Sequence, residues 1–253
     1  MKFLTFSLAG PLCSYGETDR WDYRGTAEMP TKSAVIGLLG CCMGLPRRDK
    51  RLRRLCDVLQ MAVRRDQAGT LLTDYQTVQS PTGVILNAQR KPRGSTIITP
   101  KQYLQDAVYQ IFLYGDEGEL AMCASALNHP RWVVGLGRSC CPPAVPIVPE
   151  LFEAESVVDA LRRKVDTTWL RWIWEKTMMA HKQGKNLAEQ GLTNRLCESD
   201  VRCEVEYSDS FDLNVFTGAY QIVRHDAVIC ADENRYEDRR VIACVVRREA
   251  VCF

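Results

Sequence analysis

Residues 107–134 read AVYQIFLYGDEGELAMCASALNHPRWVV, and this stretch decides the fold. Its first eight residues are rich in aromatic and β-branched side chains, which is the composition of a strand. Residues 118–128 then read as a helix, and residues 131–134 read as a last strand. The stretch therefore predicts a strand, a helix and a strand in succession.

The preceding residues extend this pattern outward. They read as strand, helix, helix, strand and strand over residues 1–8, 30–45, 49–60, 61–65 and 71–78. Gly10-Pro11 closes the first strand and Leu45-Pro46 ends the first helix, because glycine and proline interrupt regular structure. The order β-α(α)-β-β-β-α-β contains, with one additional strand, the split β-α-β-β-α-β pattern of an α+β, ferredoxin-like (RRM-like) domain.

A second region begins after the proline-rich residues 142–146. Residues 156–164 look helical, and residues 219–231 and 239–252 read as a β-hairpin around a polar turn at 232–234. Residues 166–191 have mixed periodicity and predict no element. The chain thus divides near residue 150 into a ferredoxin-like domain, 1–150, and a smaller β-rich C-terminal region, 151–253.

The twelve cysteines predict neither a disulfide framework nor a zinc site. The first ten residues are too short for a signal peptide, and no run reaches the roughly eighteen apolar residues of a membrane span. No cysteine pair has the C-x-x-C spacing that chelates zinc, and the three histidines lie far apart. We therefore expect a cytoplasmic protein with reduced thiols, no metal, no cofactor and no membrane contact.

The net charge of +2 excludes a uniformly basic nucleic-acid-binding domain, but it conceals a segregation of charge. Residues 1–100 hold 15 Lys+Arg against 8 Asp+Glu, and residues 101–253 hold 18 against 23. The acidic run at residues 198–212 suits protein contacts better than phosphate. The distribution predicts one face for RNA and other faces for protein neighbours.

The segment at about residues 78–105 is the most informative feature of the sequence. It contains four basic residues and no acidic residue, and it lies inside an otherwise compact domain. A long connection of this kind is usually functional or disordered. Arg90, Lys91 and Arg93 suit an arm that lies along a phosphate backbone, and the alternative is a merely solvated loop.

The helix start Pro30-Thr31-Lys32-Ser33 is a second candidate site. A helix N-terminus presents N–H groups and the positive end of the helix dipole, so Lys32 and Ser33 could receive a phosphate there. The alternative is a plain N-cap by Thr31 or Ser33, and the residues alone do not decide between the two.

The third candidate is Gly135-Leu136-Gly137-Arg138-Ser139. Two glycines permit close backbone approach, Arg138 can fork onto a phosphate, and Ser139 can donate a hydrogen bond. Tyr15 and Tyr75, like Trp21 and Tyr23, could stack on bases, although each alone is more often a packing residue.

Hydrolytic signatures are absent from the sequence. It contains no G-x-S-x-G, no P-loop and no H-E-x-x-H. A metal-free ribonuclease needs a positioned acid and base, and His129 is the only histidine near the predicted sheet edge. We interpret His129 as structural and predict no catalytic residue.

Several motifs, taken together, resemble the CasD family. They are Leu8-Ala9-Gly10-Pro11 with Tyr15-Gly16, Pro30-Thr31-Lys32-Ser33 leading into Gly37-Leu38-Leu39-Gly40, Asp74-Tyr75-Gln76-Thr77-Val78, and Leu136-Gly137-Arg138-Ser139-Cys140-Cys141-Pro142. CasD proteins are the subunits of type I-E CRISPR Cascade that bind the 5′ handle of the crRNA, and they belong to the RAMP superfamily. The resemblance covers about residues 1–165 and becomes thin beyond them.

The resemblance implies a ferredoxin-like body with a protruding thumb hairpin. It implies binding of the crRNA 5′ handle, capping of the filament of CasC backbone subunits, contact with the large subunit CasA, and association with target DNA in the assembled complex. The RNA-binding residues would be Tyr15, Lys32, Ser33, Tyr75, Arg90, Lys91, Arg93, Arg138 and Ser139.

Two other classes of function stay open at this point. The equivalent subunit of type I-C systems is a metal-independent endoribonuclease that processes CRISPR repeat RNA. A thiol or zinc protein is kept in view only because of the cysteine count. The type I-E-like motifs favour the non-catalytic reading, in which the chain serves antiviral defence within a ribonucleoprotein complex.

Overall fold

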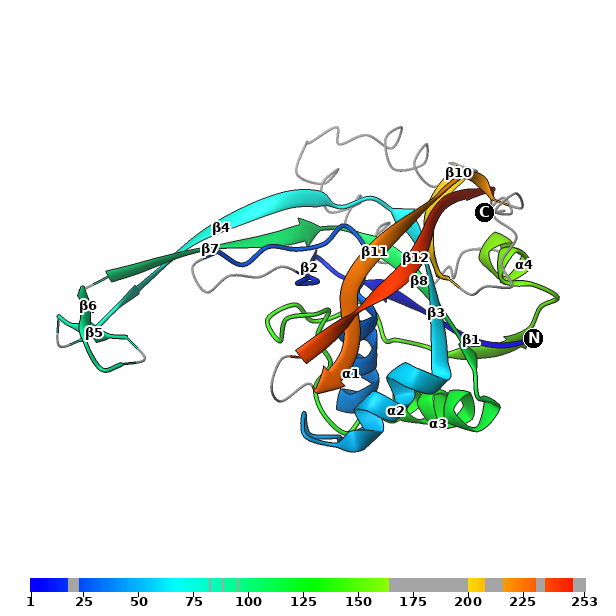
Figure 1. Ribbon diagram of the computed structural model, residues 1–253, viewed down its shortest axis with the longest axis horizontal. Coiled ribbons are helices and arrows are strands. Elements are labelled where there is room, and N and C mark those ends of the chain that lie inside the picture. Colours follow the sequence, from blue (N-terminus) through cyan, green and yellow to red (C-terminus); the bar gives the residue numbers. More distant parts are fainter. Residues whose placement is uncertain are drawn as a thin grey trace, which may run out of the picture.

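The computed structural model describes residues 1–17, 23–81, 83–87, 89–94, 96–163, 200–207, 216–230 and 235–247. These residues form a mixed α/β fold that is built mainly on antiparallel strand pairs (Figure 1). None of the helices in these ranges is long and apolar enough to cross a membrane. Trp21, residues 166–191 and the turn at 232–234 lie outside the described residues.

The largest sheet has seven strands in the order β11-β12-β10-β3-β8-β1-β9. In chain order they are β1 (Lys2–Ala9), β3 (Leu59–Gln67), β8 (Val108–Gly115), β9 (Glu150–Glu153), β10 (Asp200–Glu206), β11 (Thr217–Cys230) and β12 (Arg235–Arg247). Every neighbouring pair is antiparallel. Strands from both sides of residue 150 share this sheet, and the division into two domains stays a prediction.

The centre of the sheet is covered on both faces. Ile111 of β8 packs into a core with the helices α1 (Lys32–Met43), α2 (Lys50–Val58) and α3 (Glu117–Asn128), whereas Phe112 points to a second core with α4 (Val157–Arg162). This double burial explains the unbroken apolar run of β8, because both alternating sets of side chains leave water. The strand predicted at residues 107–114 is thereby confirmed.

Three of the helices begin directly after a residue whose side chain caps them. The side chains of Thr31, Asp49 and Asp116 accept hydrogen bonds from backbone N–H groups in the first turns of α1, α2 and α3. The α1 helix ends at Gly44, whose φ of 72° is the left-handed conformation that glycine adopts most easily. The plain N-cap reading of Thr31 is therefore confirmed.

The strand predicted at residues 131–134 is wrong. These residues form no strand, and Trp132 and Val133 are 50% and 91% exposed. The edge beside β1 is instead occupied by β9, which pairs Phe152 with Phe3. The three apolar residues after Arg131 fit a surface loop as well as a strand, since their pattern does not show whether they are buried.

The basic segment forms a long two-stranded ribbon that projects from the body of the molecule (Figure 1). In it β4 (Thr70–Gln79) pairs with β7 (Thr96–Gln105), from Thr70↔Gln105 to Gln79↔Thr96. At about 3.3 Å per residue, ten residues extend roughly 30 Å. The short strands β5 (Ile85–Leu86) and β6 (Pro92–Gly94) pair at the tip, and β2 (Leu12–Cys13) pairs with β7 at the base.

The C-terminal hairpin predicted around residues 219–252 is confirmed as β11 and β12. Strand β10 was not predicted, because its acidic residues were interpreted as a surface for protein contacts. Yet its burial alternates, with Val201, Cys203 and Val205 inside. This period of two is the signal that could have identified the strand.

Candidate functional site

Three segments that the sequence singled out line one pocket of about 520 Å³. They are the first turns of α1, the loop at residues 135–139, and residues 14–16. We call this cavity the α1 pocket. Its polar lining includes the hydroxyl groups of Ser33 and Ser139, and aromatic side chains contribute beside them. The structure thus brings together motifs that are about one hundred residues apart in the chain.

The loop at residues 135–141 is held tightly against residue 14. The backbone N–H of Ser14 donates to the carbonyl of Leu136 at 3.1 Å, and the N–H of Leu136 donates to the carbonyl of Cys141 at 2.7 Å. Gly137 has a φ of 86°, and a Cβ there would lie 1.9 Å from the carbonyl oxygen of Ser14. Only glycine therefore fits at this point of the pocket wall.

Gly137→Ala should destabilise the protein by about 2–4 kcal/mol and displace the pocket wall, because strain and a backbone clash coincide there. Gly37→Ala is the matched control. Gly37 also lines the pocket, from α1, but a Cβ there meets nothing within 4 Å, so this change should stabilise the helix by up to about 1 kcal/mol. Denaturant unfolding measures both changes, and equal effects would contradict the described loop.

Arg138 supports the protein framework in this structure. Its guanidinium donates to the carbonyls of Gln102 at 3.1 Å, Arg24 at 3.1 Å and Gly25 at 3.2 Å, and it lies 4.8 Å from the ring centre of Tyr103. These contacts connect the pocket loop to the base of the β4–β7 ribbon. A contact between Arg138 and RNA stays a prediction, and it would compete with these carbonyls.

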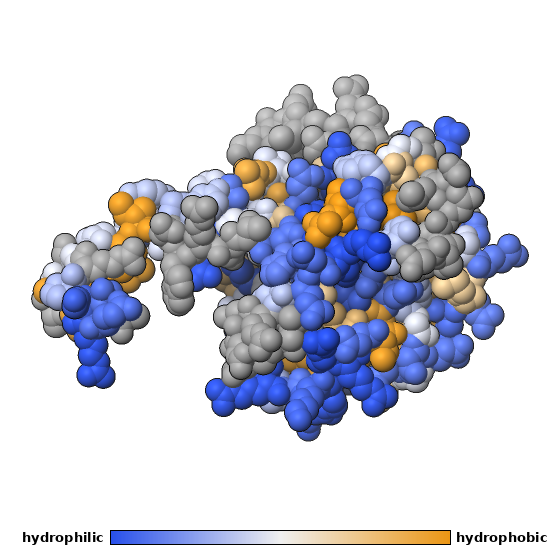
Figure 2. Space-filling view, in the orientation of Figure 1, coloured by the Kyte–Doolittle hydropathy of each residue, from blue (hydrophilic) through white to orange (hydrophobic). Residues whose placement is uncertain are grey.

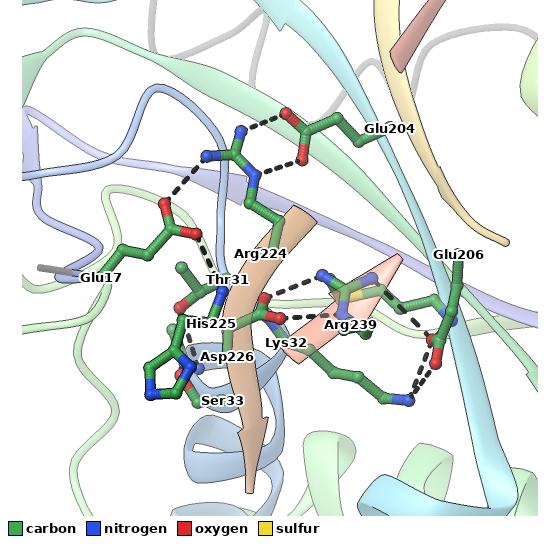
Figure 3. Close-up of polar contacts among 12 residues, drawn as sticks. Glu17, Thr31, Lys32, Ser33, Glu204, Glu206, Arg224, His225, Asp226 and Arg239 are labelled. Atoms are coloured by element: carbon green, nitrogen blue, oxygen red, sulfur yellow. Dashed lines mark hydrogen bonds and ion pairs between the residues drawn. The ribbon is translucent and has the colours of Figure 1, made fainter. Parts of the chain in front are cut away.

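The sequence predicted that Lys32 is available to a phosphate at the helix start, but in the structure its side chain is already paired. Its side chain is 3% exposed, and Nζ lies 2.8 and 2.9 Å from the two carboxylate oxygens of Glu206 (Figure 3). A phosphate contact would require this ion pair to break. The partner lies 174 residues away, so no local pattern could have indicated it.

The N-terminus of α1 is likewise occupied by a carboxylate of the chain. Asp226, which is 1% exposed, accepts a hydrogen bond of 2.6 Å from the backbone N–H of Lys32. The same carboxylate accepts two hydrogen bonds of 2.8 Å from Arg239 (Figure 3). The predicted phosphate position at this helix end is therefore filled by β11, because the helix dipole favours any anion.

A second ionic contact joins β11 to the N-terminal half. The guanidinium of Arg224 bridges Glu204 of β10 and Glu17, and the N–H of His225 donates to Glu17 at 3.2 Å (Figure 3). The C-terminal hairpin is thus fixed beside the α1 pocket, which Tyr236 of β12 also lines.

Tyr15 is buried rather than presented to a ligand. Its side chain is 2% exposed, and its ring meets that of Tyr109 edge-on, with 5.8 Å between the ring centres. Burial raises the pKa of Tyr15 well above its ordinary value. A base could not stack on Tyr15 without displacing this packing. Tyr75 on β4 is 64% exposed, so its ring is available for stacking.

The ribbon tip presents basic side chains to solvent. Arg90 and Lys91 are exposed beside a tight turn in which the Asn87 carboxamide oxygen accepts the N–H of Lys91 at 2.9 Å. Arg93 belongs to β6, and its side chain lies outside the described residues. From residue 78 to 105 the sequence contains no acidic residue that could neutralise these cations.

Several residues that line the α1 pocket were not predicted as site residues, among them Arg47, Trp132 and Tyr236. Arg47 is exposed directly after the Leu45-Pro46 helix stop, at the start of the basic run that includes α2. That run was the available signal, but in α2 itself Arg51, Arg53 and Arg54 are each paired with a carboxylate. Across the described ranges, no group of three or more His, Cys, Asp or Glu side chains is placed to hold a metal ion.

The sequence matches a family model and a named relative. The model of the family described as "CRISPR-associated protein (Cas_Cas5)" matches residues 3–205. The CRISPR system Cascade subunit CasD of Escherichia coli (strain K12) is 33% identical over 162 residues, which cover 58% of this chain and 69% of that protein.

Two solved structures have a similar fold. A crystal structure of a Cas protein superimposes with a TM-score of 0.58 at 22% identity, over 97% of this chain and 95% of that one. A chain of a CRISPR RNA-guided surveillance complex superimposes with a TM-score of 0.64 at 23% identity, over 98% and 91%. At these identities the likeness concerns the fold alone.

Proposed function

Because the chain belongs to the CRISPR-associated Cas5 family, we propose that it is the subunit of a type I-E Cascade complex that binds the 5′ handle of the crRNA. The observation that carries the proposal is the α1 pocket at the foot of a projecting ribbon with a basic tip. A pocket and an arm together suit single-stranded RNA, whose backbone is held by cations while unstacked bases enter pockets.

In this proposal the ribbon is the thumb. Arg90, Lys91 and Arg93 contact phosphates at its tip, and Tyr75 offers a ring along its length. At the α1 pocket, the backbone of the RNA is contacted by Ser33, Ser139 and Arg47. The geometry favours these residues over Lys32 and Tyr15, which are buried. Arg138 then acts mainly through the carbonyls that join the pocket loop to the ribbon.

The body is proposed to be a ferredoxin-like RNA-binding domain over residues 1–150. The strand order β3-β8-β1-β9, with α1 and α3 on one face, supports this assignment. The proposed partners are the CasC filament, which this subunit caps, the large subunit CasA, and target DNA within the cytoplasmic complex. Trp132 and Val133, which line the pocket, are exposed apolar side chains that a neighbouring subunit would cover.

Arg47→Ala should weaken binding of handle RNA and lower the slope of log affinity against log salt concentration by about 0.7, the value for one phosphate of a single strand. Arg51→Ala is the matched control, because it removes the same charge outside the pocket, where Arg51 is paired with Asp49 at 2.7 Å. Titration of labelled RNA at several salt concentrations measures both. If the two variants have equal slopes, Arg47 does not contact phosphate.

The proposed subunit is non-catalytic, and its rival is a metal-independent endoribonuclease. Incubation of the purified chain with repeat RNA in EDTA separates the two. We expect intact RNA bound to protein. Cleavage at one position within the repeat would favour the endoribonuclease.

A further inference from the structure

Two adjacent cysteines, Cys140 and Cys141, follow directly after Ser139, which lines the α1 pocket. Cys140 is exposed and Cys141 is buried. Their Sγ atoms are 4.0 Å apart. The hydroxyl of Tyr103, at the base of the ribbon, lies 3.8 Å from the Sγ of Cys140. An accessible thiol and a second thiol thus lie within reach of one another.

The backbone of this pair holds the pocket loop in place. The carbonyl of Cys141 accepts the N–H of Leu136 at 2.7 Å, and the N–H of Cys141 donates to the carbonyl of Arg138 at 3.0 Å. Both bonds close the turn that carries Gly137, Arg138 and Ser139. A covalent change at the thiols would therefore reach the pocket wall through these two bonds.

The two thiols differ in their access to solvent and to reagents. Burial raises the pKa of Cys141 to about 12, so this thiol stays protonated near neutral pH. Cys140 is exposed and can be reached by a reagent dissolved in water. This difference identifies Cys140 as the residue that reacts first and Cys141 as the residue that resolves the product.

We propose that Cys140 and Cys141 form a thiol–disulfide exchange site, which reacts with small-molecule disulfides and thereby regulates RNA binding at the α1 pocket. The chemistry at the thiols stands on the geometry of the pair. The regulatory part rests on the proposed function.

The exchange balances in two steps. The thiolate of Cys140 attacks one sulfur of the small disulfide, so a mixed disulfide forms at Cys140 and one small thiolate leaves, taking up the proton that Cys140 released. The thiol of Cys141 then attacks the Sγ of Cys140 while its proton passes to the departing sulfur, so the second small molecule leaves as a thiol. Two protein thiols are oxidised, and one small disulfide is reduced to two thiols.

The product should be easily reduced, as a regulatory bridge must be. Adjacent Cα atoms are about 3.8 Å apart across a trans peptide, which is less than the separation that most disulfides span. The bridge will therefore be strained, and strained disulfides are the labile ones. Closing the ring also turns the 140–141 peptide, whose N–H makes one of the two bonds that hold the loop.

The test treats the full-length chain with oxidised glutathione as the small disulfide and maps the products by mass spectrometry. We expect one peptide that contains both Cys140 and Cys141 and has lost two hydrogen atoms. Cys141→Ser should stop at a glutathione adduct on Cys140, and Cys140→Ser should block the reaction at both positions. Cys41→Ser is the control. Cys41 also lines the pocket, and this variant should still form the Cys140–Cys141 bridge.

RNA titration of the same samples tests the regulatory part. The oxidised wild type should bind handle RNA about three to ten times more weakly, the size of one lost hydrogen bond, and a reductant should restore the affinity. Cys140→Ser should bind equally well before and after treatment.

Each failure has a distinct signature. No oxidation at Cys140, or a bridge from Cys141 to Cys13, overturns the exchange site whatever the RNA result. A Cys140–Cys141 bridge with unchanged RNA affinity overturns the regulation alone. If the reduced wild type binds no handle RNA, the proposed function fails, while mass spectrometry still decides the chemistry of the pair.

Discussion

Asp226→Ala should lower the free energy of unfolding by about 3–5 kcal/mol, which is the cost of breaking a buried ion pair from one side. Asp226 is 1% exposed, and its carboxylate binds both the guanidinium of Arg239 and the backbone N–H of Lys32. Without it Arg239, whose side chain is 6% exposed, retains Glu206 at 3.9 Å as its one ion-pair partner among the described residues. The first turn of α1 also loses its anion.

Asp238→Ala is the control for this prediction. Asp238 lies in the same hairpin and pairs with His225 at 2.8 Å, but the two side chains are 72% and 55% exposed. Its removal should change the stability by no more than about 0.5 kcal/mol, as for most surface pairs. Urea unfolding followed by circular dichroism measures both variants. Equal losses would show that Asp226 does not anchor the hairpin to α1.

The joint change of Arg90, Lys91 and Arg93 to alanine should reduce the affinity for handle RNA about a hundredfold, if each phosphate contact contributes about 1 kcal/mol. The slope of log affinity against log salt concentration should fall by about 2, since each single-strand phosphate accounts for about 0.7. The folded body should be unaffected, because the ribbon tip projects away from both cores (Figure 2).

A control with the same loss of charge is available on α2. Arg51, Arg53 and Arg54 are paired with Asp49, Asp57 and Glu119, and α2 lies on the body rather than on the arm (Figure 1). Their joint change to alanine should leave the salt slope nearly unchanged. If both triple variants lose affinity equally, the loss comes from net charge, and the ribbon has no specific part in binding.

Elements with a strong local pattern were predictable from the sequence. The strand β8 was predictable, because both of its faces are buried and its run of aromatic and β-branched residues is typical of a strand. In the ribbon, the strand predicted at residues 71–78 is β4, but the returning strand was predicted only as part of a basic arm. This returning strand, β7, contains Pro100, which cannot donate to a neighbouring strand and argues against a strand assignment. Residues 131–134 were wrongly predicted as a strand, because a short apolar run does not show whether its side chains are buried.

The segments of the site were predictable from the sequence, but the hydrogen bonds and ion pairs between them were not. The helix start and the 135–139 loop were both identified, and they line the same pocket. The burial of Lys32 was not foreseeable, because its partner Glu206 and the helix-capping Asp226 are 174 and 194 residues away. Arg138 was interpreted as an RNA contact, since a sequence does not reveal backbone carbonyls that converge from distant segments.

The central claim is that this chain holds the 5′ end of a guide RNA, and sequencing the RNA that co-purifies with the tagged chain from cells that express its CRISPR locus tests it most directly. The account predicts short RNAs that begin with one constant, repeat-derived segment followed by variable sequence. It also predicts that the Arg90, Lys91 and Arg93 triple variant recovers much less of them than the α2 control. Recovery of no RNA, or of RNA with no common 5′ segment, would contradict it.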